Sequence, residues 1–416
     1  MLDSTIRTCL LAGLAVAAAQ VVRAENWPAW RGPRGDGTSL ETSIPVQWSA
    51  TSNVVWKSAI PGAGHASPIV WGDRVFTVSA LTNMQRPDRL LLCFDRASGK
   101  VLWQRTVVQS PFEKKHRLNS HASSTPATDG RLVYATFLDG KAMVVAAYDF
   151  NGNQRWRVRP GPFASVHGFC SSPILFKDKV IVNGDHDGDS YLVALARADG
   201  KTLWKVPREN KTRSYCAPLI RDIGGRTQMI LSGDKCVASY DPNDGSRHWI
   251  IDGPTDQFVA SIVHNPKADL LFVTGGYPEL HILGVRPDGH GNITPTHLAW
   301  RTTKGVSYVP SPIAAGDWFF VVSDSGTASC FEAATGTILW QERLGGEHHA
   351  SLVSANGLLY FLSDEGVMTV VQAGPQFQLI ARSEIGERCF ASPALSEGQI
   401  FLRGDRHLYC IGRAKQ

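Results

Sequence analysis

Histidines and aromatic residues recur at one kind of position along this chain. Five of the 13 histidines stand a few residues before short segments that resemble Ala-Ser-Pro: His65, His121, His167, His348 and His349. Tyrosine, phenylalanine and arginine take similar places elsewhere: Tyr215, Phe258, Tyr308, Arg388 and Phe390. Imidazole can ligate a metal or move a proton near neutral pH, and aromatic rings can pack on a flat ligand.

A fold that gathers these positions would build one ligand-binding site from them. The candidate members of that site are His65, His121, His167, His349, Tyr215, Tyr308 and Arg388. The alternative is that the histidines form hydrogen bonds that seal strand ends. Since the sequence contains no Gly-x-Ser-x-Gly, His-Glu-x-x-His or phosphate-loop pattern, it predicts no catalytic set.

An acidic segment, Asn183–Ser190, is the second place where chemistry could occur. Asp185, Asp187 and Asp189 alternate with other residues there, and carboxylates so spaced can supply oxygen ligands to calcium. The spacing matches an EF-hand loop only in part, and no glutamate closes the segment. A solvated turn rich in aspartate and glycine is the alternative.

The elements that must position these residues come from an internal repeat. Segments resembling Ala-Ser-Pro recur about every 46 residues between positions 68 and 393, which is the spacing of four-stranded propeller blades. The eight markers end at residues 68, 126, 173, 218, 262, 312, 352 and 393. A Gly-x-x-x-Trp pattern keeps step with them, with its tryptophans at 103, 156, 204, 249 and 340. Each glycine suits a tight hairpin turn, and each tryptophan falls in the last strand of its unit.

The eighth unit lacks a fourth strand, and Asn53–Ser58 near the N-terminus looks like a last strand without a unit. Joining the two closes a ring and removes two exposed edges. We therefore predict an all-β, eight-bladed propeller over residues 53–416, with an open β-solenoid as the alternative. In this topology the connections into the first strands and the second-to-third turns ring the mouth of the central channel.

Residues 1–24 read as a signal peptide: Arg7 is followed by an apolar run, and Ala24 stands at a small-residue cleavage site. We expect an exported protein, periplasmic or extracellular, with an uncleaved membrane anchor as the alternative and no later membrane-spanning segment. Residues 25–52 form a Pro/Gly-rich lead-in, expected to pack on the barrel surface. Seven cysteines follow the signal peptide without a Cys-x-x-Cys pair, and we expect most to be buried small hydrophobes.

The charge pattern excludes one class of partner. The formal net charge is only +5, and no basic run with interleaved aromatic residues occurs, so we expect no nucleic-acid partner.

Two units, residues 93–103 and 330–340, resemble the tryptophan-docking repeat of quinoprotein alcohol dehydrogenases. They also resemble the non-catalytic propellers that share this repeat, including the BamB-type outer-membrane assembly factor, and residues 26–37 look like the opening of exported PQQ-like propellers. The resemblance implies the propeller fold and two classes of function.

The first class is an exported scaffold that binds a cell-envelope protein, a glycan or a small ligand at the channel mouth, with no cofactor expected. The second is a PQQ-dependent oxidoreductase, in which PQQ and calcium would be cofactors. The chain departs from those enzymes because it lacks their vicinal cysteine pair and a haem motif, and it is shorter. The residues therefore favour a binding role over an enzymatic one; a hydrolase or lyase acting on polysaccharide remains a third alternative on fold analogy.

Overall fold

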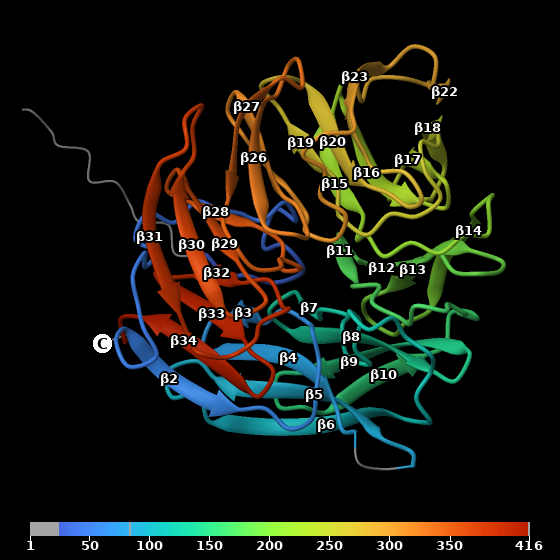
Figure 1. Ribbon diagram of the computed structural model, residues 1–416. Helices are drawn as coiled ribbons and strands as arrows, with labels where there is room; N and C mark the ends of the chain where they lie inside the picture. Colours follow the sequence, from blue (N-terminus) through green and yellow to red (C-terminus); the bar gives the residue numbers. More distant parts are fainter. Residues whose placement is uncertain (1–24, 83–84, 415–416) are drawn as a thin grey trace, which may run out of the picture.

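The computed structural model describes residues 25–82 and 85–414, so the predicted signal peptide at residues 1–24 lies outside the described part. All 34 regular elements of this part are β-strands. They form eight sheets arranged in a ring around a central channel, as Figure 1 shows. The predicted eight-bladed propeller is confirmed. Within the described residues, no helix is long and apolar enough to cross a membrane.

Each blade is an antiparallel meander whose first strand lines the channel and whose fourth strand lies outermost. The first four blades are β3 (Ile69–Trp71), β4 (Arg74–Ala80), β5 (Asp88–Asp95), β6 (Val101–Gln109); β7 (Ala127–Thr128), β8 (Leu132–Asp139), β9 (Ala142–Asp149), β10 (Gln154–Val158); β11 (Ile174–Phe176), β12 (Lys179–Gly184), β13 (Tyr191–Ala196), β14 (Thr202–Pro207); and β15 (Leu219–Ile223), β16 (Arg226–Gly233), β17 (Cys236–Tyr240), β18 (Arg247–Asp252). The next four are β19 (Val263–Asn265), β20 (Leu270–Gly275), β21 (His281–Val285), β23 (Leu298–Thr302); β24 (Ile313–Ala315), β25 (Trp318–Val322), β26 (Thr327–Glu332), β27 (Ile338–Arg343); β28 (Val353–Ala355), β29 (Leu358–Leu362), β30 (Val367–Gln372), β31 (Leu379–Glu384); and β32 (Ala394–Ser396), β33 (Gln399–Arg403), β34 (His407–Gly412), β2 (Val54–Ala59).

The eighth blade is closed by the N-terminal strand, as predicted. Strand β2 pairs antiparallel with β34, with Trp56 opposite Cys410, and so supplies the missing outer strand. Two short strands not foreseen from the sequence extend other blades. These are β1 (Thr38–Ser39), which adds in parallel to β28, and β22 (Gly291–Asn292), which adds in parallel to β18.

The tryptophans of the Gly-x-x-x-Trp pattern dock neighbouring blades against each other. Trp56 of blade 8 donates a hydrogen bond from Nε1 to the Arg96 carbonyl of blade 1 at 2.7 Å, and six further tryptophans make the same kind of bond. The turn glycine Gly99 has a φ of 71°, and a Cβ there would lie 2.6 Å from the Trp56 ring. Glycine is required because it provides both the left-handed turn and the space for the ring.

The serine or threonine of the Ala-Ser-Pro-like markers links the first strands around the channel. Thr125 accepts a hydrogen bond from the Ser67 backbone N–H at 3.0 Å, and Ser172 accepts one from Thr125 at 2.9 Å. The same link joins Ser261 to Ser311, Ser311 to Ser351, and Ser351 to Ser392. The hydroxyl satisfies a buried backbone donor, which explains why this residue type recurs in the repeat.

The seven cysteines of the described chain are all free, and six of them are buried. This agrees with their expected role as small core residues.

The lead-in covers the face of the propeller that is opposite to the channel mouth. It contacts the first-to-second turns: Asn26 Oδ1 accepts a hydrogen bond from Gly72 N–H at 2.7 Å, and the Glu41 carboxylate accepts from Gly398 N–H. In the same region Asn356 donates to the Thr42 carbonyl at 3.2 Å.

The middle of the lead-in enters the channel, which differs from the expected packing on the barrel surface. Trp30 donates a hydrogen bond to Ser261 Oγ at 3.1 Å, and Arg31 donates to the carbonyls of Ser311 and Pro312. Side chains of the lead-in therefore occupy the channel, where they donate to acceptors in the segments that lead into the first strands β19 and β24.

Candidate functional site

A blind cavity of about 230 Å³ opens at the channel mouth. Every connection into a first strand contributes to its wall, and Trp30 from the lead-in lies at the closed end. Five of the seven residues predicted from the sequence line this cavity: His65, His167, His349, Tyr215 and Tyr308. The fold thus brings together residues that lie hundreds of positions apart in the chain.

His65 contributes an uncharged ring to the cavity wall. Its imidazole stacks on Phe390 with ring centroids 4.6 Å apart, and its Nδ1 lies 3.2 Å from the Leu118 carbonyl oxygen. Burial, assisted by the nearby positive charge of Arg403, lowers the pKa of His65 to about 4. His65 is therefore neutral at physiological pH.

His167, Gln257 and Tyr215 form a neighbouring part of the wall. The Gln257 side-chain nitrogen lies 3.0 Å from His167 Nδ1, and burial, together with nearby Arg213, lowers the pKa of His167. The Tyr215 hydroxyl lies 3.1 Å from Ser165 Oγ, and burial raises the pKa of this tyrosine. This part of the wall offers hydrogen-bonding groups without net charge.

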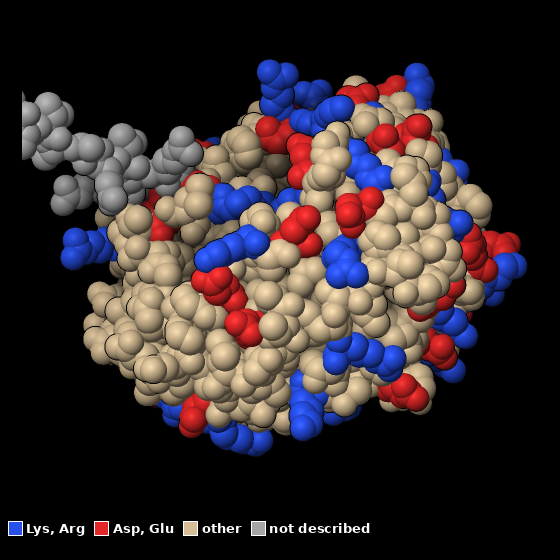
Figure 2. Space-filling view, turned by 90° about the horizontal axis from the view of Figure 1, so that it is seen from above, with Lys and Arg blue, Asp and Glu red and all other residues tan. Residues whose placement is uncertain are grey.

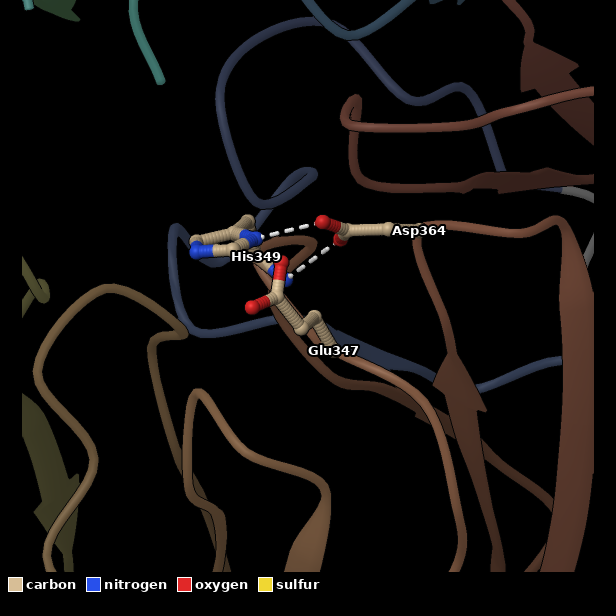
Figure 3. Close-up of side chains that lie close together, drawn as sticks. All are labelled: Glu347, His349 and Asp364. Atoms are coloured by element: carbon tan, nitrogen blue, oxygen red, sulfur yellow. Dashed lines mark hydrogen bonds and ion pairs between the residues drawn. The ribbon is translucent and has the colours of Figure 1, made fainter. Parts of the chain in front are cut away.

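His349 differs from the other cavity histidines because a carboxylate holds it. Its Nδ1 lies 2.7 Å from Asp364 Oδ2, and its backbone N–H donates to Asp364 Oδ1 at 3.1 Å. Burial alone would lower the pKa of His349, but the hydrogen bond to Asp364 and the negative charges of Asp364, Asp324 and Glu347 together outweigh burial, and the pKa is raised. Figure 3 shows both contacts, with the Glu347 carboxylate beside them.

The other two predicted residues, His121 and Arg388, do not line the cavity. His121 stacks on Phe112 with centroids 3.8 Å apart, and its Nδ1 lies 3.3 Å from Glu113 Oε1. Arg388 is exposed and lies over the outer side of Phe390, 4.9 Å from the ring centre. These two residues are therefore not part of the cavity wall.

Several cavity residues were missed by sequence reasoning. His116 and Asn119 lie earlier in a long connection than the position at which the other histidines stand, while Gln257 adjoins the marker of its blade. Trp30 arrives from the lead-in, where a tryptophan inside a Pro/Gly-rich segment was the only signal available.

The three aspartates of the acidic segment do not converge on a common point. Asp185 is fully buried and pairs with Arg208, whose Nε lies 2.9 Å from Oδ1. Asp187 pairs with Arg213 at 2.6 Å, and the exposed Asp189 pairs with Lys211 at 2.8 Å. The arrangement provides each carboxylate with its own cation.

The cavity wall contains no lysine, arginine, aspartate or glutamate among its lining residues. Figure 2 shows one outer face of the molecule, where Lys and Arg side chains are interspersed with Asp and Glu and no continuous basic surface forms. Charges of both signs are therefore mixed on this face, while the cavity is lined by aromatic, imidazole, hydroxyl and amide groups.

Comparisons with known proteins place this geometry among related propellers. Residues 45–142, 87–277 and 293–374 match the family described as the outer membrane protein assembly factor BamB. No curated protein matches the chain in sequence.

The solved structures that resemble the chain include both functional classes. BamB from Moraxella catarrhalis superposes with a TM-score of 0.61 at 14% identity, covering 86% of this chain and 99% of that one. A europium-containing methanol dehydrogenase gives 0.56 at 12% identity, covering 91% and 89%. The quinohemoprotein alcohol dehydrogenase from Comamonas testosteroni gives 0.54 at 13% identity, covering 94% and 81%. At these identities the likeness concerns the fold alone.

Proposed function

The chain belongs to the BamB-like family of PQQ-like repeat propellers, and on that premise we propose that it is an exported binding protein whose channel mouth receives an uncharged ring, such as a sugar residue of a cell-envelope glycan. Export to the periplasm or the cell exterior is part of this proposal. It rests on the residues preceding the lead-in and on the family, whose described member assembles outer membrane proteins.

The observation that carries the proposal is the composition of the blind cavity. Trp30, Tyr215 and Tyr308 present aromatic surfaces, on which the apolar face of a sugar ring packs. Asn119 and Gln257 add amide groups that can both donate and accept hydrogen bonds. A ligand with one apolar face and several hydroxyl groups can pack on the aromatic side chains and form hydrogen bonds with the amide side chains.

The size of the cavity limits what it can enclose. A volume of about 230 Å³ lies below the roughly 300–1,000 Å³ typical of sites that bury a drug-sized ligand. One ring of a longer glycan fits this space better than a folded protein surface does, because a surface cannot enter a blind hole.

PQQ does not fit the residues present. This cofactor is a fused-ring quinone that carries several carboxylates, and buried carboxylates require cations or many donors. Among the described residues no lysine or arginine lines the cavity, His65 is neutral, and His349 is already paired with the Asp364 carboxylate. We therefore derive no oxidation step for this site.

The proposal is tested with a microarray of peptidoglycan fragments and envelope polysaccharides, followed by calorimetry with the best-binding oligosaccharide. We expect Gln257→Ala to weaken binding about tenfold, since it removes hydrogen bonds from a buried wall. Tyr277→Ala is the matched control, because Tyr277 is a highly exposed aromatic residue outside the cavity lining.

Equal loss in both variants would place binding on the outer rim and contradict the proposal. Binding of PQQ with a visible absorbance change, in the absence of glycan binding, would favour the oxidoreductase instead.

A further inference from the structure

We propose that Glu347, His349 and Asp364 form a divalent-metal site at the edge of the channel mouth, independent of glycan binding. Glu347 and His349 lie two residues apart on the connection between β27 and β28, and Asp364 lies in the turn between β29 and β30. Figure 3 shows the three side chains gathered at one point, with the His349 ring beside both carboxylates.

The donor atoms are close enough to share one ion. One ligand atom from each of the three residues lies within 4.8 Å of the others, and His349 Nδ1 is 2.7 Å from Asp364 Oδ2. Ligands about 2.0–2.2 Å from a zinc ion lie roughly 3–4 Å apart, so only a small displacement of the side chains is needed. Among the described residues, no other group of three or more histidine, cysteine or acidic side chains comes this close together.

The backbone already holds the site in place. Asp364 N–H donates to the Glu347 carbonyl at 2.8 Å, and Cys389 N–H donates to the Asp364 carbonyl at 2.9 Å. The His349 backbone N–H fixes the second carboxylate oxygen of Asp364. Such outer contacts orient metal ligands before the ion binds, which reduces the entropic cost of binding.

Within the described part of the chain, the site has more carboxylates than basic side chains. Asp364 is buried, and its ion-pair partner is His349; Glu347 has no ion pair with lysine or arginine. Asp324, whose negative charge also acts on His349, accepts hydrogen bonds from the backbone N–H groups of Tyr308 at 2.8 Å and Val309 at 3.2 Å. One imidazolium offsets only one of these carboxylates, and a divalent ion would compensate the remaining negative charge.

The ligand set selects the kind of ion. One imidazole with two carboxylates suits zinc or manganese, whereas calcium requires about 6–8 oxygen ligands. Glu347 is exposed, so solvent reaches the site, and His349 also belongs to the cavity wall. An ion held here therefore lies beside the cavity and keeps positions open for water or a ligand oxygen.

The test is calorimetric titration of the chelator-treated mature chain with ZnCl2, with CaCl2 titrated in parallel. We expect one zinc ion per chain and much weaker binding of calcium. Glu347→Gln should lower zinc affinity about tenfold or more; because Glu347 is exposed, this change does not disturb the core. Asp364→Asn should lower it by a similar or larger factor.

Asp187→Asn is the matched control, since it removes a carboxylate that already has a cation partner, and zinc affinity should not change. Cobalt substitution adds an independent readout, because a ligand field including His349 produces visible absorption bands that His349→Asn abolishes. Zinc binding of equal affinity in all variants, or no zinc binding by the unmodified chain, overturns the proposal.

Discussion

Two acidic regions at the mouth face of this propeller differ in the side chains that pair with their carboxylates. In the turn between β12 and β13, Asp185, Asp187 and Asp189 each meet a basic side chain. At the junction of blades 6 and 7, Glu347 and Asp364 surround His349 and meet no lysine or arginine among the described ion pairs. The first region is dense in carboxylates along the sequence, and the second is not.

The comparison teaches that carboxylate spacing along the chain is a poor guide to cation sites. Whether a group of carboxylates is free to bind a cation depends on whether the fold brings lysine or arginine side chains to it. The basic stretch Arg208–Arg213, which the chain carries into blade 4, lies against the aspartates and neutralises them. Among the described ion pairs, no lysine or arginine meets Glu347 or Asp364, and we propose that a metal ion balances their charge.

The largest expected effect on stability comes from removing the buried ion pair between Asp185 and Arg208. Asp185→Ala should lower the free energy of unfolding by about 3–5 kcal/mol, because it leaves the Arg208 guanidinium buried without its counter-charge. Urea denaturation followed by tryptophan fluorescence measures the change.

Asp187→Ala serves as the control, since its pair with Arg213 is partly exposed and such pairs contribute only about 0–1 kcal/mol. Equal effects of the two variants would show that the buried pair has no special role in the blade 3 turn.

An intermediate effect is expected from adding metal to the unneutralised region. At zinc concentrations about 100 times Kd, the free energy of unfolding should rise by about 2.7 kcal/mol, because the ion binds only the folded arrangement. Calcium at the same concentration should leave it unchanged. Thermal denaturation of the chelator-treated chain, with zinc or with calcium added, measures both changes in stability. If calcium stabilises the chain and Asp187→Asn removes that stabilisation, the cation site lies in the acidic segment of blade 3 and the comparison is contradicted.

The smallest effect is expected from changing the charge of the second region without metal. Asp364→Asn should alter the free energy of unfolding by only about 1 kcal/mol or less, since asparagine keeps an oxygen that accepts the hydrogen bond from the His349 backbone N–H. The same denaturation experiment checks it. A loss as large as that from Asp185→Ala would mean that Asp364 has a structural role comparable to the buried pair of blade 3.

Much of the fold was predictable because its determinants are local and repeated. The glycine at position 99 and the tryptophan at 103 define a turn and a last strand within one unit, and their recurrence defines the blade count. The incomplete eighth unit and the strand around Trp56 then identified the closure. The parallel additions β1 and β22 were not predictable, since each is only two residues long.

The cavity was predictable in part. The repeat placed the connections that carry His65, His167 and His349 at one mouth, but it left open whether their side chains converge; the structure brings all three to the cavity wall. Whether a side chain points inward depends on its neighbours: Glu113 and Phe112 hold His121 away from the cavity, and Phe390 covers one face of His65.

The sequence by itself determined the number of blades, the way in which the ring closes and the face on which the histidines gather, because strand periodicity, turn glycines and docking tryptophans act over short distances. Only the tertiary structure decided which groups meet across the channel. Trp30 donates a hydrogen bond to Ser261, 231 positions away; within one blade, Asp185 pairs with Arg208, 23 positions away. Such contacts depend on how the closed ring orients each connection. For the same reason, the metal site we propose lies where Asp364 meets His349, away from the segment in which aspartates are most dense.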